Sequence, residues 1–132
     1  MENAKSIAGS ASDAQPEHAR DILTRACLRA ADLLSVPQQQ LAKLLGVSAA
    51  TVTRMRQGAY ALEPSRKEWD LALLFLRLFR SLDSIVAGRE TDARAWLHSD
   101  NQELRGKPAE LILQVSGLVH VADYLDAVRA RV

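Results

Sequence analysis

The sequence has very little cysteine, few aromatic residues and almost no net charge. Its single cysteine, Cys27, excludes a disulfide framework and a cysteine-based zinc cluster. Formal net charge is only +1, which excludes a protein coated with positive charge. The apolar run at residues 71–76 is far shorter than the ~20 residues that a membrane span needs. Because the first residues also lack a basic segment followed by an apolar stretch, we expect a soluble, intracellular protein without membrane contact.

The sequence also lacks a set of residues that could perform catalysis or bind a metal ion. His18, His98 and His120 have no partner at helical spacing, and we interpret each as a surface or capping residue. Asp123 and Asp126 fit the solvated face of a helix better than a catalytic pair of carboxylates. We therefore predict that the protein is not an enzyme and has no cofactor or metal site.

The residues that are abundant predict an all-α fold. A hydrophobic fraction of 48% suffices for a packed core in one domain, or in two very small domains that share a core. Apolar residues recur at helical spacing, and no stretch alternates for long enough to be a strand. Residues 1–15 lack this spacing and are predicted to be a disordered arm. The predicted helices cover about 17–34, 37–45, 49–57, 64–86 and 90–98, followed by one that opens at Pro108 and a last one capped by Ser116.

The predicted helix at 64–86 is apolar on more than one face, which is typical of a helix that is buried on several sides. In so small a protein this pattern fits a central core helix. It equally fits a core helix that also contacts a second copy of the chain. Cys27 falls on the apolar stripe of the first helix and is expected to be a small core residue.

Residues 38–58 satisfy the geometric demands of a helix-turn-helix unit. Ala42 provides the small side chain that two crossing helices need, and Gly46 suits the positive φ of the turn. Ser48 is placed to cap the second helix. The residues expected to point inward and hold the crossing angle are Leu41, Leu45, Val47, Val52 and Met55.

A helix-turn-helix unit binds DNA by inserting its second helix into the major groove. The outward residues expected there are Ala49, Ala50, Thr53 and Arg54, of which Arg54 suits a bidentate contact to guanine. Two alanines offer no hydrogen bonds, so one copy would read few bases. We therefore predict a homodimer or higher assembly on half-sites about one DNA turn apart. The residues assigned to phosphate contacts are Gln38, Lys43, Ser48, Thr51 and Arg56.

The second half of the chain carries an ordered set of motifs. They are a Trp-Leu pair, an Asn, a Leu-x-Gly-x-Pro step that opens a helix, and a final Gly-x-x-x-Val-x-x-x-Leu helix, at Trp96-Leu97, Asn101, Leu104–Pro108 and Gly117–Leu125. In this order and spacing they resemble the C-terminal domain of the Xre/MbcA/ParS antitoxins, and the resemblance extends back over about residues 20–132. Family members often continue past the last helix with a Gly-containing tail, whereas this chain stops at Val132.

The resemblance implies an Xre-like helix-turn-helix bundle at 16–88, followed by a small helical toxin-binding domain at 89–132. Such bacterial antitoxins act in the cytoplasm beside a toxin that consumes NAD or ADP-ribosylates a target, often one with a RES domain. The C-terminal domain covers the toxin, and the helix-turn-helix represses the shared promoter by binding its operator. The residues that the resemblance places at the toxin are Trp96, Tyr124, Arg129, Arg131 and Val132.

Plainer interpretations of these residues stay open. Trp96 also fits a core anchor that bridges the fourth and last helices, and Gly117 suggests close backbone approach to a neighbour. Arg129 and Arg131 also fit solvated residues that are favourable at a helix C-terminus. The rival function is a stand-alone repressor whose C-terminal helices dimerise it or sense a small ligand.

Overall fold

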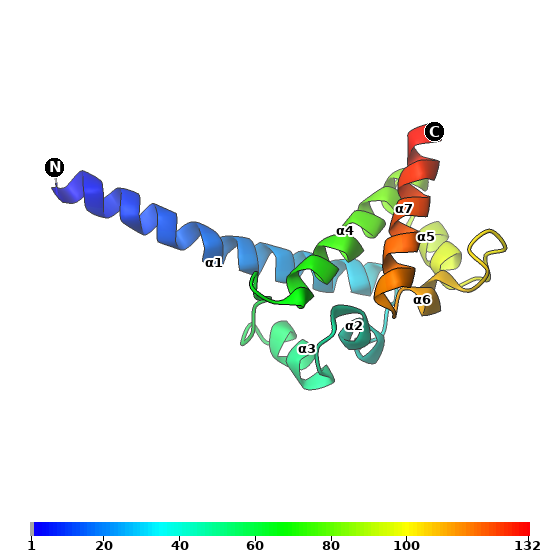
Figure 1. The fold of residues 1–132 in the computed structure, drawn as a ribbon, viewed down its shortest axis with the longest axis horizontal. Coiled ribbons are helices and arrows are strands. Elements are labelled where there is room, and N and C mark those ends of the chain that lie inside the picture. Colours follow the sequence, from blue (N-terminus) through cyan, green and yellow to red (C-terminus); the bar gives the residue numbers. More distant parts are fainter. Residues whose placement is uncertain (1) are drawn as a thin grey trace.

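The computed structural model describes the backbone of residues 2–132 and the side chains of residues 17–132. Within these residues there is no β-strand, and the only strand-like feature is an isolated antiparallel bridge between Asn101 and Gly106. The all-α prediction is therefore confirmed. The helices are α1 (Glu2–Leu33), α2 (Gln38–Leu45), α3 (Ala49–Arg56), α4 (Lys67–Ile85), α5 (Glu90–Leu97), α6 (Pro108–Leu111) and α7 (Val115–Arg131), arranged as in Figure 1.

Helix α1 begins at Glu2 rather than near residue 17. The side chains of residues 2–16 lie outside the described part, so the predicted disordered arm at 1–15 stays a prediction. From Leu23 onward one face of α1 enters the core, and Cys27 is fully buried there. Burial raises the pKa of the Cys27 thiol to about 12, because the thiolate would lose its hydration. Cys27 is thus the core residue that was expected.

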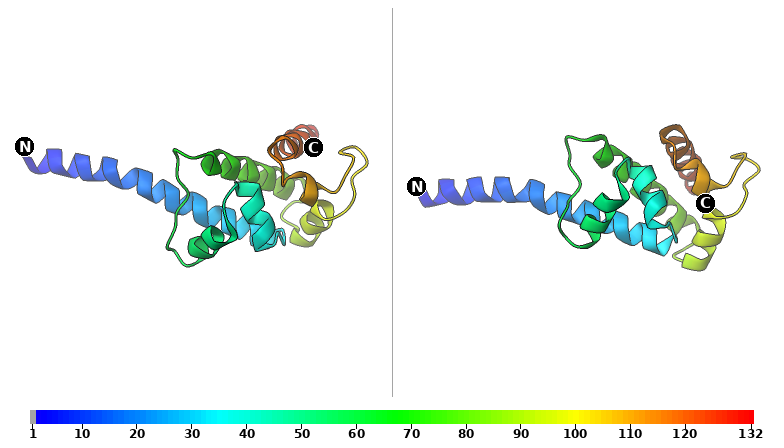
Figure 2. Two further views of the ribbon diagram at one scale, coloured as in Figure 1. Left: turned by 60° about the horizontal axis from the view of Figure 1, so that its bottom comes forward. Right: turned by 90° about the horizontal axis from the view of Figure 1, so that it is seen from below.

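The turn between α2 and α3 forms as its residue types predict. Gly46 has φ 72°, and Ala42 is buried where the two helices approach each other. Ser48 caps α3 by accepting the backbone N–H of Thr51 at 3.1 Å. Figures 1 and 2 show α2 and α3 together on one side of the molecule, away from the free end of α7.

Helix α4 is the central element, because it packs against α1, α2, α5 and α7, and most extensively against α7. Phe75, Leu78 and Leu82 of α4 are almost completely buried. The helix starts at Lys67, one turn later than predicted. Its predicted stop is confirmed, since Gly88 has φ 78° and donates its N–H to the Asp83 carbonyl at 2.9 Å. No helix among the described residues is long and apolar enough to cross a membrane.

The boundary between α6 and α7 differs from the prediction. Helix α6 ends at Leu111, and α7 begins at Val115 with Gln114 at its N-cap, so the predicted cap at Ser116 is wrong. The physical reason is a close approach between the two helices. A Cβ on Gly117 would lie 1.9 Å from the Leu111 carbonyl oxygen, which confirms the close approach expected at this glycine. Backbone packing therefore decides where α7 begins.

Candidate DNA-binding and partner-binding surfaces

The outward face of α3 carries the residues that were predicted to face the major groove. Ala49, Ala50 and Thr53 are all exposed. Gln38, at the start of α2, donates from Nε2 to the Thr53 hydroxyl at 2.6 Å and to the Ala49 carbonyl at 3.2 Å. This side chain therefore links the two helices across the face that would meet DNA. Lys43 is exposed in the last turn of α2.

Two of the predicted contact residues on α3 are engaged within the protein. Thr51, predicted as a phosphate contact, is instead buried, and its hydroxyl lies 2.9 Å from the Ser48 Oγ. Arg54 is exposed as expected, but its Nη2 donates to the Thr51 hydroxyl at 3.2 Å. Its guanidinium also lies over the Tyr60 ring, 5.8 Å from the centroid.

Arg56, at the end of α3, forms a two-pronged ion pair with Asp32 of α1. The two N···O distances are 3.1 Å and 2.9 Å. The hydrogen bond from Arg56 lowers the pKa of Asp32, and the same bond raises the pKa of Arg56. The arginine that was assigned to a phosphate is thus already paired with an acid.

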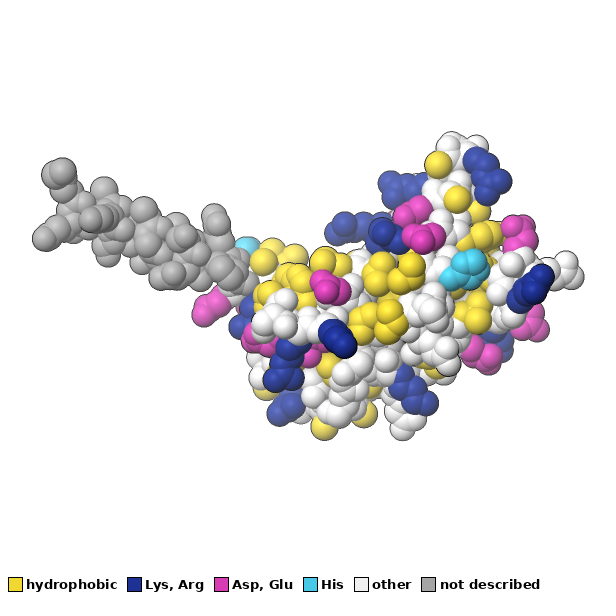
Figure 3. All heavy atoms as spheres, viewed as in Figure 1, with side chains coloured by type: hydrophobic (Ala, Val, Ile, Leu, Met, Phe, Trp, Pro, Cys, Tyr) yellow, Lys and Arg dark blue, Asp and Glu magenta, His cyan; other side chains and the backbone are white. Residues whose placement is uncertain are grey.

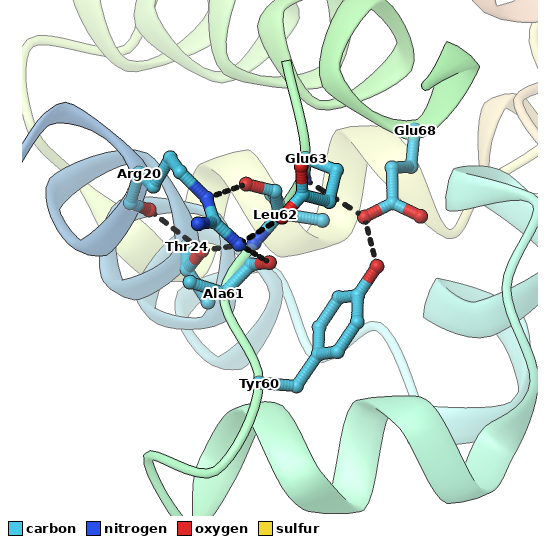
Figure 4. A network of polar contacts seen from close by, with 7 residues as sticks. All are labelled: Arg20, Thr24, Tyr60, Ala61, Leu62, Glu63 and Glu68. Atoms are coloured by element: carbon cyan, nitrogen blue, oxygen red, sulfur yellow. Dashed lines mark hydrogen bonds and ion pairs between the residues drawn. The ribbon is translucent and has the colours of Figure 1, made fainter. Parts of the chain in front are cut away.

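The segment that follows α3 is held by a polar network that sequence reasoning did not find (Figure 4). The Tyr60 hydroxyl donates to the Glu68 Oε2 at 2.6 Å, and Glu68 is buried in the first turn of α4. Burial and this hydrogen bond together raise the pKa of Tyr60. Thr24 of α1 accepts the Leu62 N–H at 2.9 Å, and Arg20 donates from Nε to the Leu62 carbonyl at 3.0 Å.

A second polar cluster joins α4 to α7. Ser81 is fully buried and donates to the Asp126 Oδ1 at 2.6 Å. Arg77 contacts the Asp123 Oδ1 at 2.7 Å and the Asp126 Oδ2 at 3.2 Å. Asp123 and Asp126 thus lie on a solvent-exposed face of α7, as expected, and both carboxylates also pair with groups on α4, which was not expected.

The aromatic residues predicted at the toxin form one stacked pair. Trp96 of α5 and Tyr124 of α7 have ring centroids 6.2 Å apart and planes inclined by 14°. Both side chains are half-buried, so part of each ring packs on the core and part reaches the surface. Trp96 thus contacts the last helix, as expected, with Tyr124 as its partner there. The other part of the expected bridge, to the fourth helix, stays a prediction.

The last turn of α7 presents exposed cationic side chains. Arg129, Arg131 and Val132 are all exposed, and 86% of the Val132 surface is accessible. Arg131 donates from Nε to the Ala127 carbonyl at 3.3 Å. Among the residues that the structure describes, neither arginine has a carboxylate partner. Figure 3 shows Lys and Arg side chains gathered around this end of α7.

The loop between α5 and α6 explains the Asn and Gly of the motif. Asn101 exchanges two backbone hydrogen bonds with Gly106, at 2.9 and 3.1 Å, and its Oδ1 accepts the Leu104 N–H at 3.0 Å. The strained backbone position is Arg105, with φ 60°, rather than Gly106. His98 ends α5 and its Nε2 lies 2.8 Å from the Leu34 carbonyl oxygen, a capping role as predicted.

No group of three or more potential metal ligands comes together within the described part of the chain. What the fold defines is a helix-turn-helix protein whose second helical domain packs on it through the shared helix α4. Comparison with family models is consistent with both parts. Residues 19–77 match the antitoxin Xre-like helix-turn-helix domain, and residues 81–131 match the antitoxin Xre/MbcA/ParS C-terminal toxin-binding domain. A search of curated proteins found no match.

The chain therefore belongs to the Xre/MbcA/ParS antitoxin family, which confirms the resemblance drawn from its motifs. It is an antitoxin of a toxin–antitoxin system, with one domain of the DNA-binding type and one of the toxin-binding type. The two matched ranges meet within α4, between Arg77 and Ser81. The predicted domain boundaries at residues 16, 88 and 89 stay predictions.

Proposed function

We propose that this antitoxin neutralises a RES-like toxin that consumes NAD or ADP-ribosylates a target, and that it represses its own promoter. The observation that carries the toxin-directed half is the exposed last turn of α7. It combines two arginines that have no acidic partner among the described residues with an apolar end at Val132. The guanidinium groups therefore lack a carboxylate partner in the part of the chain described, and the apolar surface of Val132 is open to solvent, within a domain of the toxin-binding type.

The mechanism that we propose is occlusion of the toxin's pocket. A helix end inserted there would occupy the volume that NAD, the toxin's dinucleotide substrate, needs. Guanidinium groups would form strong, directional hydrogen bonds to any carboxylate that lines such a pocket. The stacked pair of Trp96 and Tyr124 would provide the rigid aromatic contact nearer the base of α7.

The promoter-directed half rests on α2 and α3. Thr53 and Arg54 would meet base edges, with Ala49 and Ala50 packing on thymine methyl groups. The residues left for phosphate contacts are Gln38, Lys43, Ser48 and Arg56, the last after release from Asp32. Because so few side chains can contact base edges, a homodimer or a larger toxin–antitoxin assembly on the operator is favoured.

The experiment that tests the toxin-directed half removes residues 129–132 and co-expresses the variant with the neighbouring toxin gene. Binding should remain detectable in co-purification, because the Trp96–Tyr124 pair and most of α7 stay in place. NAD consumption by the toxin should be released, and growth should stop. The matched control is Arg29→Ala on exposed α1, which should neutralise like the wild type. Full neutralisation by the truncated antitoxin would contradict the proposal.

A further inference from the structure

Tyr60 lies in the segment between α3, the second helix of the helix-turn-helix, and α4. It follows the turn at Gly58, which has φ 74°. Its hydroxyl is held by Glu68, a carboxylate with only 5% of its surface exposed, at 2.6 Å. The same Glu68 oxygen accepts the backbone N–H of Glu63 at 3.1 Å. The ring is therefore anchored to the body of the protein at its polar end.

The anchored ring supports the guanidinium of Arg54, 5.8 Å from the ring centroid. On the other side, Arg54 donates to the Thr51 hydroxyl at 3.2 Å, and Thr51 is held in turn by Ser48. A long, flexible side chain is thus contacted from the N-terminal turn of α3 and from the segment after it. A guanidinium that is ordered before binding loses less side-chain entropy when DNA binds.

Arg54 keeps most of its hydrogen-bonding capacity. A guanidinium has five N–H donors, and the contact with Thr51 uses Nη2 alone. Arg56 on the same helix is paired with Asp32, whereas Arg54 has no carboxylate partner among the described residues. Of the two arginines on α3, Arg54 is therefore the one whose donors remain available to an acceptor on DNA.

We infer that Tyr60 is a positioning residue for DNA recognition: fixed by buried Glu68, its ring holds the Arg54 guanidinium on the outward face of α3. This inference rests on the proposed promoter binding. Tyr60 acts through Arg54 and makes no DNA contact of its own. The acceptor on DNA is a base edge or a phosphate oxygen, which present the same acceptor chemistry to a guanidinium.

A double-mutant cycle tests this inference. The probes are a labelled duplex from the promoter immediately upstream of the chain's own gene and a duplex of scrambled sequence, both titrated by fluorescence anisotropy. Tyr60→Leu should weaken promoter binding about threefold, as expected for an exposed cation–π contact and the order it imposes. In an Arg54→Ala background the same change should have no effect. Tyr60→Phe, which keeps the ring but loses its hydrogen bond to Glu68, should weaken promoter binding by less than Tyr60→Leu, and again only when Arg54 is present.

Equal losses from Tyr60→Leu in both backgrounds would overturn the inference, because Tyr60 would then act on the fold and not on Arg54. If Tyr60→Leu unfolds the protein, Tyr60→Phe replaces it in the cycle, because it keeps the ring but loses the hydrogen bond that anchors the ring to Glu68. A loss confined to the promoter duplex supports contact with a base, and an equal loss on both duplexes supports contact with a phosphate. Absence of promoter binding by the wild type would instead overturn the proposed function, and this inference with it.

Discussion

The cationic side chains of α3 are contacted by other groups of the protein, whereas those on the last turn of α7 are left largely free. On α3, Arg56 is paired with Asp32, and Arg54 rests on Tyr60. On the last turn of α7, Arg129 and Arg131 are exposed and, in the part of the chain described, meet no carboxylate. One surface is held in place by the protein's own groups, whereas the other leaves its strongest hydrogen-bonding groups for a partner.

This difference suits the two kinds of partner. DNA presents a regular backbone, so a side chain that is positioned in advance, as Arg54 is, can meet it with little rearrangement, whereas Arg56 must first leave Asp32. A protein partner can supply its own carboxylates and hydrophobic pocket, and an open cationic end then gains contacts that it lacks alone. The difference also implies that the two surfaces can be disabled separately, since they lie on opposite sides of the molecule (Figures 1 and 2).

The largest expected effect comes from Gly117→Ala, which should disrupt the α7 surface and leave the α3 surface intact. The added Cβ would lie 1.9 Å from the Leu111 carbonyl oxygen, so α6 and α7 must separate. We expect the free energy of unfolding to fall by about 3 kcal/mol, as measured by urea denaturation. Toxin capture should be lost, while binding to the promoter duplex should persist below the transition.

The matched control for this change is Gly106→Ala. Its Cβ would meet the Leu111 side chain and no backbone among its three nearest atoms, with Cδ2 nearest at 3.3 Å. This side chain can move by the few tenths of an ångström required, so the cost should stay below about 1 kcal/mol. Similar costs at the two glycines would show that the backbone contact at Gly117 does not set the position of α7.

Sequence reasoning predicted the parts of this molecule that depend on local geometry. Gly46 and Ser48 determine the turn and the cap of α3 within a few residues, and both were identified. The start of α7 could not be predicted from capping propensity, because it depends on the packing of Gly117 against Leu111. A capping rule pointed to Ser116, whereas α7 begins at Val115, where it packs closely on the end of α6.

The polar pairs between helices were also beyond sequence reasoning. Arg56 and Asp32 are 24 positions apart, and Arg77 and Asp123 are 46 apart. Helical periodicity tells which face of a helix is apolar, but it does not tell how two helices are rotated against each other. Whether an exposed charged residue also finds a partner on a neighbouring helix depends on that rotation, which is why the pairing of Asp123 with Arg77 was not predicted.

An intermediate effect is expected at Ser81, where α4 meets α7. Ser81→Ala removes a buried hydroxyl that donates to Asp126 at 2.6 Å. Loss of one hydrogen bond to a charged acceptor should lower the free energy of unfolding by about 1.5 kcal/mol, again by urea denaturation. Ser84→Ala, at an exposed position of the same helix, is the control. Equal stabilities of the two variants would show that the Ser81–Asp126 bond does not stabilise the contact between α4 and α7.

The smallest expected effect concerns the ion pair of Asp32 and Arg56. It measures how strongly Arg56 is held on the α3 surface. The hydrogen bond from Arg56 lowers the pKa of Asp32 below its ordinary value of 3.8. A carboxyl whose pKa is lower in the folded state stabilises the protein above its unfolded pKa, and the stabilisation is lost as the pH falls through the folded pKa. Both partners are partly solvated, so the gain at neutral pH should be only about 0.5 kcal/mol.

A double-mutant cycle of Asp32→Asn and Arg56→Ala, measured by urea denaturation over a pH series, isolates this coupling. The coupling energy should be constant near neutral pH, should start to fall as the pH drops below the ordinary pKa of Asp32, and should vanish only below its lowered folded-state pKa. Asp32→Asn alone also frees Arg56, so binding to the scrambled duplex should tighten slightly at low salt, where phosphate contacts weigh most. A coupling energy that persisted in acid would mean that the pair is not held by charge. The arginines of α3 and α7 would then differ less in their charge pairing than the structure indicates.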